Sequence, residues 1–252
     1  GITVDLREER FRLNKDIPIP LYYQVKRMIL NELASGNLKL GDKLPAETEF
    51  CEYLQLSRPT VRLALNELVA EGILIRKKRS GTFVAEPKIE LGLNICIEQF
   101  QKYMEQTGRD CTVQVLDFCL VDKIGEINQR LNLSAGERLI YLKRKWMVGN
   151  CSIVYNATYM PESLWESVKD QDFTKFSLID VLNRCTKLPV SSGKVKVEAV
   201  LASKNDIELL EIDRTRASLL YIADLLQSED GTPLCWSISR YRGDKVHLAY
   251  QV

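Results

Sequence analysis

The sequence has 252 residues, of which 45% are hydrophobic and 27% are charged, a composition that excludes a disordered or fibrous chain. The length indicates two domains, and the lack of any run of ~20 apolar residues or of an apolar signal segment predicts a cytoplasmic protein. The formal charge of +1 indicates no charged partner by itself, but it averages over regions of opposite charge.

The first third of the sequence has a helical pattern after a charged start. Residues 1–16 have no sustained apolar period, and we expect them to form a flexible arm. Apolar residues then recur every fourth position from Leu21 to Leu33, which predicts a helix with one apolar face. A shorter helix is expected over residues 47–54, followed by a tight connection to Ser57.

The next helix has a well-marked beginning and an unusual exposed face. Ser57 is a good N-cap, and Pro59 is tolerated in a first turn because no intrahelical donor is lost there. Side chains that suit base edges and thymine methyl groups lie opposite the apolar face of this helix, at Arg58, Arg62, Leu63 and Asn66.

Two short strands are expected after this helix, over residues 73–75 and 82–84, joined by a basic tip at residues 77–81. Three helices and a hairpin make a winged helix-turn-helix. Between residues 57 and 84 the basic residues exceed the acidic ones by four, and a local basic face is what phosphate binding needs. The alternative for the basic tip alone is a solvated turn.

The stretches PLYYQVKRMI, LPAETEF and SRPTVRLALNELVAEGILIRKKRSGTFV make residues 17–85 resemble the DNA-binding domain of GntR-type bacterial transcription regulators. The resemblance implies that the third helix enters the major groove and the wing tip enters the minor groove. It assigns groove and phosphate contacts to Arg58, Thr60 and Arg62, and wing contacts to Lys78, Arg79, Gly81 and Thr82. The family commonly has an arginine where this chain has Thr48, so we expect an unusual operator.

The remaining two-thirds of the sequence mixes strands and helices without an internal repeat. Glu86-Pro87-Lys88 interrupts the pattern, and we expect a linker over residues 86–92. Gly149-Asn150 and Asp230-Gly231 each join two alternating stretches, which predicts two hairpins. Helices are expected over 97–107, 124–133, 161–168, 178–185 and 206–211, and further strands over 112–121 and 195–201. Residues 93–252 are therefore expected to form an α+β domain on an antiparallel sheet.

The stretches GERLIYLKRKW, ATYMPESLW, FSLIDVL and SRYRGDKV make this second domain resemble the UTRA domain, which follows the winged helix in the HutC subgroup of GntR regulators. The resemblance implies a chorismate-lyase-like fold that dimerises and binds a small, often anionic, metabolite on its sheet face. The candidate effector-binding residues that we take from it are Arg144, Tyr159, Ser177, Glu198 and Tyr241.

These candidates differ in what supports them. Arg144 matches an anion-binding arginine of the family and offers a planar fork of five donors, and its alternative is a surface strand residue. Ser177 caps a helix N-terminus that favours a phosphate or carboxylate, although a cap needs no ligand. Tyr241 matches a pocket tyrosine of the family. Tyr159 and Glu198 are expected to face the same cavity, with core or surface roles as the alternatives.

Two departures from the family predict a less charged and more apolar pocket. Trp146 stands where members that bind amino-sugar phosphates have a second arginine, and Cys235 stands where they have an acid. An aromatic or sugar-like ligand with one anionic group, such as a sugar phosphate or a carboxylate, fits this pattern as well as an amino-sugar phosphate does.

The sequence thus predicts a bacterial transcription regulator, in the role of a repressor, that binds a palindromic operator as a homodimer and responds to a small anionic metabolite. One alternative is an architectural or replication-control protein whose second domain only dimerises. A chorismate-lyase-like enzyme is the other. With a single histidine, His247, and seven scattered cysteines that form no C-x-x-C pair, we expect no metal, no cofactor and no histidine-based catalysis.

Overall fold

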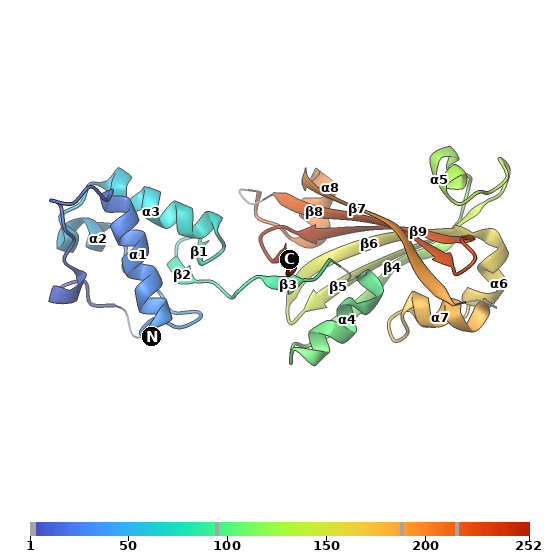
Figure 1. Ribbon diagram of the computed structural model, residues 1–252, viewed down its shortest axis with the longest axis horizontal. Helices are drawn as coiled ribbons and strands as arrows, with labels where there is room; N and C mark the ends of the chain where they lie inside the picture. Colours follow the sequence, from blue (N-terminus) through green and yellow to red (C-terminus); the bar gives the residue numbers. More distant parts are fainter. Residues whose placement is uncertain (1–3, 94–95, 187–188, 215–216) are drawn as a thin grey trace. The chain divides into compact units, whose positions relative to one another are not determined.

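The computed structural model describes residues 4–93, 96–186, 189–214 and 217–252 (Figure 1). The chain divides into two compact units, Gly1–Lys88 and Ile89–Val252, which are described one at a time below. None of the helices in the described ranges is long and apolar enough to cross a membrane.

The first unit is the winged helix-turn-helix that the sequence predicts. It consists of α1 (Leu21–Ala34), α2 (Glu47–Leu54), α3 (Arg58–Ala70), β1 (Leu74–Lys77) and β2 (Gly81–Val84). The two strands pair antiparallel, from Leu74 opposite Val84 to Lys77 opposite Gly81. Four side chains on one face of α3 are completely buried, namely Val61, Ala64, Leu65 and Leu68. The opposite face of α3 is therefore left to solvent.

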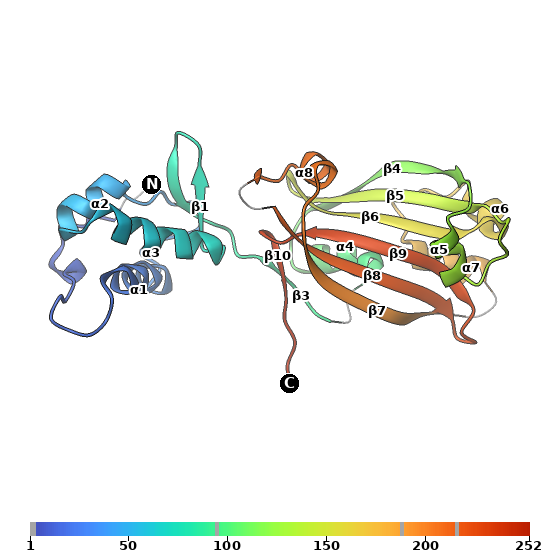
Figure 2. The same cartoon turned by 90° about the horizontal axis from the view of Figure 1, so that it is seen from above.

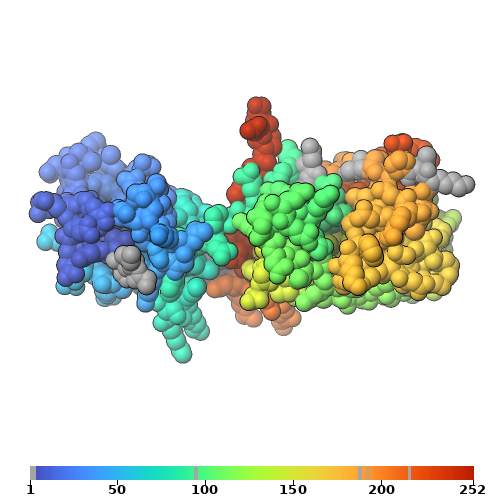
Figure 3. Space-filling view, turned by 90° about the horizontal axis from the view of Figure 1, so that it is seen from below, coloured from blue at the N-terminus to red at the C-terminus, as the bar shows by residue number. Residues whose placement is uncertain are grey.

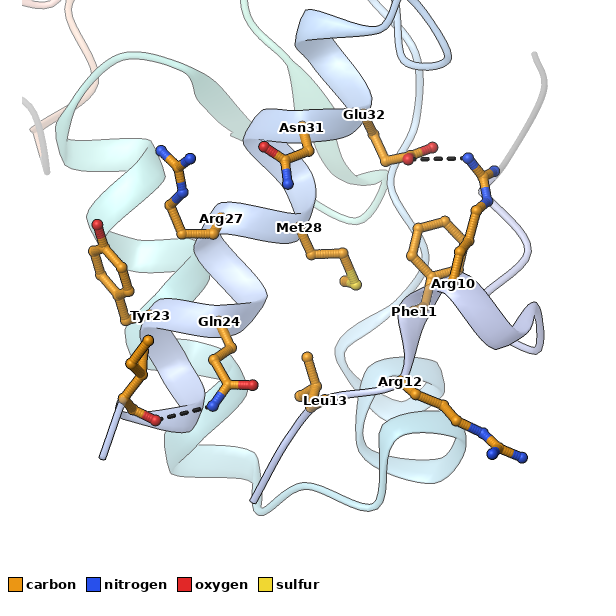
Figure 4. Close-up of a pocket in the computed structure, with 11 residues that line it drawn as sticks. Arg10, Phe11, Arg12, Leu13, Tyr23, Gln24, Arg27, Met28, Asn31 and Glu32 are labelled. Atoms are coloured by element: carbon orange, nitrogen blue, oxygen red, sulfur yellow. Dashed lines mark hydrogen bonds and ion pairs between the residues drawn. The ribbon is translucent and has the colours of Figure 1, made fainter. Parts of the chain in front are cut away.

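The segment before α1 is packed against the first unit, which differs from the expectation of a flexible arm over residues 1–16. Leu6 and Phe11 are 5% and 2% exposed and belong to the same apolar core as α1 and α3. Arg10 places its guanidinium 3.1 Å from the carboxylate of Glu32 on α1, as Figure 4 shows. Two apolar side chains among many charges are enough to anchor this segment, and so short a pattern has no detectable period.

The second unit contains a six-stranded antiparallel sheet with strand order β4-β5-β6-β9-β8-β7 (Figure 2). Its strands are β4 (Cys111–Val121), β5 (Leu139–Val148), β6 (Cys151–Pro161), β7 (Val190–Leu201), β8 (Ser218–Ser228) and β9 (Pro233–Arg242). A separate parallel pair joins β3 (Ile89–Leu91) to β10 (Val246–Leu248). Part of the expected linker over residues 86–92 is therefore a strand, in which Ile89 and Leu91 are buried.

Helices cover both faces of this sheet. On one face lie α4 (Ile97–Gln106), α6 (Trp165–Val168) and α7 (Leu178–Cys185), and on the other lie α5 (Gly125–Arg130) and α8 (Lys204–Leu210) (Figures 1 and 2). In Figure 3, the green α4 and the orange α7 cover the first of these faces. The α+β class is thus confirmed, with two helical layers around a central sheet.

Alternation along the strands decides which layer each side chain meets. In β6, Val154 packs with α4 and Met160 with α7, whereas Tyr155 packs with α8 and Tyr159 with α5. Because consecutive strand residues point to opposite faces, a functional side chain belongs to one layer only.

The packed segment before α1 gives a test of the first unit's core. Replacing Phe11 by alanine removes a buried ring, and we expect the free energy of unfolding of the first unit to fall by about 3–5 kcal/mol. Amide hydrogen exchange of α1 in the full chain measures this, with the exposed Arg12→Ala as the matched control. Unchanged exchange in Phe11→Ala would show that the segment is detached in solution.

Candidate functional site

The exposed face of α3 carries the side chains that the sequence singles out. Arg58, Arg62 and Asn66 are exposed, and Leu63 is 46% exposed, although it lies on a helix whose apolar face is fully packed. Thr60 is half-buried, and its hydroxyl lies 2.7 Å from that of the N-cap Ser57. This face offers guanidinium, amide and methyl groups side by side, which are the groups that read base edges in a major groove.

One carboxylate holds α3 and the wing together. Glu47, at the start of α2, accepts a hydrogen bond from Arg62 Nε at 2.9 Å and another from Arg76 Nη2, also at 2.9 Å. The bond to Glu47 raises the pKa of Arg62, which stays charged. Sequence reasoning missed Glu47, because its role depends on two residues 15 and 29 positions away.

The wing tip projects basic side chains around a sharp turn. Lys78 and Arg79 are exposed, and no carboxylate of the described residues lies within ion-pair distance of either. Arg79 and Gly81 have φ angles of +61° and +117°, and the second is a conformation that side chains rarely adopt, so glycine is needed there. Thr82 is half-buried in β2. The tip is therefore a compact basic loop suited to phosphates or a minor groove.

In the second unit, a cavity of about 560 Å³ lies between the sheet and α4. Its apolar wall includes Ile97, Val195, Ile222 and Leu226. The polar groups around it are those of Gln99, Ser191, Asp224, Ser237, Ser239 and Tyr241. Its size and its combination of apolar walls with converging polar groups are typical of a small-molecule site.

A buried hydrogen-bond network forms the floor of this cavity. Asn156 Nδ2 donates to Ser237 Oγ at 2.7 Å and to Ser239 Oγ at 3.0 Å, and Thr158 Oγ1 donates to Asn156 Oδ1 at 2.6 Å. Since both serine oxygens accept from Asn156, their hydroxyl protons are available to donate to another group. Sequence reasoning missed Asn156, and its only signal was an amide within an otherwise apolar and aromatic stretch.

Arg144 is buried in an ion pair next to the cavity. The side chains of Arg144 and Glu98 are 1% and 2% exposed, and both terminal nitrogens of the guanidinium bond the carboxylate, Nη1 at 3.3 Å and Nη2 more closely. The same carboxylate accepts the backbone N–H of Leu178 at 2.5 Å. The guanidinium also lies 4.8 Å from the Trp146 ring. Arg144 is thus no surface residue, and its charge is already balanced by Glu98.

The other predicted effector residues divide between the two faces of the sheet. Tyr241 lines the cavity and is 1% exposed, and burial raises its pKa. Ser177 caps α7 by accepting the Asp180 N–H at 3.1 Å. Tyr159 and Glu198 do not line the cavity, which corrects the expectation that they face it.

The directions of the two side chains explain both corrections. Tyr159 points to the α5 face, where its ring lies 5.2 Å from that of Tyr141. Glu198 is exposed and pairs with Lys196 at 2.9 Å. Their strands, β6 and β7, are separated by β9 and β8 and are not neighbours.

Trp146 and Cys235 are both buried in apolar clusters instead of lining the cavity. Burial raises the pKa of the Cys235 thiol well above its usual value, so the thiol stays neutral. The uncharged side chains at these two positions therefore belong to the apolar core beside the cavity and not to the cavity lining.

Comparisons with known proteins match both units. A family model described as "Bacterial regulatory proteins, gntR family" matches residues 21–84, and the UTRA domain model matches residues 106–247. The chain is 30% identical to the HTH-type transcriptional repressor NagR of Bacillus subtilis over 238 residues, which cover 94% of this chain and 97% of that protein. It is 29% identical to the histidine utilization repressor of Pseudomonas putida, with 81% of each chain covered.

Among solved structures, PhnF from Mycobacterium smegmatis has a TM-score of 0.61 with this chain at 21% identity, and the match covers 90% of this chain and 98% of that one. At this identity the likeness establishes a common fold.

The ion pair between Arg144 and Glu98 predicts a non-additive effect on stability. Arg144→Ala leaves the Glu98 carboxylate buried without its counter-charge, and we expect the free energy of unfolding to fall by about 3–5 kcal/mol. The double variant Arg144→Met/Glu98→Leu removes both charges and should recover most of this loss. Denaturant unfolding followed by tryptophan fluorescence measures both. Additive losses in the double variant would contradict a buried pair.

Proposed function

Since the chain belongs to the GntR family of bacterial transcription regulators and carries a UTRA domain, we propose that it represses genes from an operator and is released by a small effector. The observation that supports this best is the exposed reading face of α3, held to a basic wing, in one chain with a cavity of ligand size that has polar groups in its lining. A family of regulators gives no support to an enzyme, and we propose none. We place its action in the cytoplasm, where bacterial operators lie.

DNA binding falls to α3 and the wing in this proposal. Arg58, Thr60 and Arg62 contact bases and phosphates in the major groove. The wing residues Lys78, Arg79, Gly81 and Thr82 hold the adjacent minor groove and its phosphates. Glu47 fixes the direction of Arg62 and Arg76 before DNA arrives, which reduces the entropy lost on binding.

The operator is a palindrome bound by a homodimer. One recognition helix reads only a few base pairs, so two copies are needed for useful specificity, and a twofold dimer imposes a twofold operator. The second unit supplies the dimer contact in this proposal. A chain in which that unit only dimerises would need no cavity, and the polar floor on Asn156 therefore favours a sensor over an architectural protein.

The effector binds in the cavity of the second unit, against Tyr241 and the floor serines. Arg144 and Ser177 lie beside this site. Glu98, the partner of Arg144, comes between two residues of the cavity wall in the sequence of α4, Ile97 and Gln99. The ligand shifts the protein between DNA-binding and non-binding arrangements only if it binds one of them better, typically by about 1–3 kcal/mol.

The DNA-binding face predicts two kinds of effect. Arg58→Ala and Arg62→Ala should each weaken operator binding by about 1–3 kcal/mol and alter base preference, because they remove contacts at base edges. Arg79→Ala should weaken binding evenly across sequences and reduce its salt dependence by about one counterion, because it removes a phosphate contact. Fluorescence anisotropy over a salt series measures both, with the exposed Arg130→Ala of the second unit as control. Equal operator affinity for wild type and the Arg58→Ala/Arg79→Ala double variant would refute this assignment.

A variant that fills the cavity should lose the response to the ligand and keep DNA binding. Ser191 lines the cavity on the edge strand β7, so the larger side chain of Ser191→Trp fills the cavity. Ser167→Trp places the same ring at an exposed position of α6 and serves as the control. We expect the first variant to lose the ligand's effect on operator affinity and the second to keep it. A screen of sugars, sugar phosphates and carboxylates against a fluorescent operator identifies the ligand. A metabolite that binds the chain and never changes operator affinity would disprove the sensor role.

A further inference from the structure

We infer that Glu98 is a built-in anion that fills the anion site beside the effector cavity, and that the effector is therefore an uncharged, hydroxyl-rich molecule of sugar or polyol type. This inference rests on the proposed function and names the ligand class of the same cavity. It also replaces the anionic ligand that the sequence predicts.

The contacts of Glu98 are those that a bound phosphate or carboxylate makes. Its carboxylate is held by both terminal nitrogens of Arg144 and by the N–H of Leu178, in the first turn of α7. A guanidinium fork and a helix N-terminus are the two commonest partners of an anion in proteins. With the side chains of Glu98 and Arg144 at 2% and 1% exposure, water does not share the site.

An anionic ligand gains little by displacing Glu98. Its charged group would make the same bonds to Arg144 and Leu178 that the carboxylate of Glu98 makes already. The exchange therefore replaces one set of hydrogen bonds by an equivalent set. The displaced Glu98 would have to leave a buried position on the first turn of α4, and the ligand would lose its own hydration. The anionic part of such a ligand therefore adds little affinity.

A charged side chain of the cavity lining also disfavours an anion. Asp224 lines the cavity, is 7% exposed, and lies opposite Ser237 on the neighbouring strand. Asp224 thus brings a carboxylate to the lining of the cavity. A carboxylate accepts hydrogen bonds from ligand hydroxyls, and it repels a phosphate.

The remaining polar groups match a hydroxyl-rich ligand. Ser237 and Ser239 accept from Asn156 and keep their protons to donate, so the floor offers two donors next to the acceptor Asp224. Tyr241 and Ile222 supply the apolar surface on which the C–H face of a sugar ring packs. A volume of about 560 Å³ accommodates a mono- or disaccharide.

The test compares ligands that differ only in charge, on the full chain. Calorimetry measures binding of uncharged mono- and disaccharides and of their phosphate esters to wild type, and thermal unfolding measures the effect of inorganic phosphate. We expect each sugar that binds to be about tenfold or more tighter than its phosphate ester. We also expect inorganic phosphate to leave the wild-type Tm unchanged relative to chloride at equal ionic strength.

Removing the built-in anion should create an anion site. In Glu98→Ala, inorganic phosphate should raise the Tm, and this response should disappear in Glu98→Ala/Arg144→Met. Glu105→Ala, on the same helix but exposed, should behave as wild type. Should Glu98→Ala not fold, Glu98→Ser also removes the carboxylate and leaves its space open, and a phosphate-dependent rise in its Tm is expected as well.

The inference is overturned if a phosphate ester binds wild type more tightly than its parent sugar, or if phosphate stabilises wild type as much as Glu98→Ala. Operator binding is measured separately, so the two proposals fail in different ways. An uncharged sugar that binds without changing operator affinity ends the proposed function and leaves the ligand class intact. A phosphate ester that binds through Arg144 and releases the operator overturns the ligand class and supports the proposed function.

Discussion

Successive residues of a strand point to opposite faces of the sheet, and in the second unit this alternation separates a sensing layer from a structural one. Even-numbered residues of β6, Asn156 and Thr158, form the floor of the cavity, while odd-numbered ones pack under α5 and α8. Arg144 of β5 and Tyr241 of β9 belong to the first layer for the same reason. The layers can therefore change independently in sequence, one with the ligand and the other with the packing of the fold.

Charge in the first unit is arranged by internal pairing. Lys26 of α1 bonds both Glu67 of α3 and Glu71, the residue that caps the C-terminus of α3. Glu47 is shared by Arg62 and Arg76, whereas Lys78 and Arg79 have no acidic partner among the described residues. A protein with a formal charge of +1 thus presents an unbalanced basic surface where the wing turns.

Local signals predicted most of the fold and about half of the candidate site. The N-cap Ser57, the period of α3 and the Gly149-Asn150 hairpin depend on neighbours in sequence, and the structure has them as predicted. The strands β3 and β10 are three residues long and pair across the whole second unit, so no local pattern marks them. The bond between Arg144 and Glu98 spans 46 residues, and the face of the sheet that carries the cavity is set by helices far in sequence from Tyr159 and Glu198.

The pairing of β3 with β10 also sets an order for folding during synthesis. Residues 1–88 form a compact unit with its own core, so this unit can fold as soon as that stretch has left the ribosome. Glu90 of β3 pairs with His247 of β10, 157 residues later, and the second unit stays incomplete until then. A nascent chain therefore carries a finished DNA-binding unit well before its sensor can form, and premature termination within the second unit yields a DNA-binding unit without a sensor.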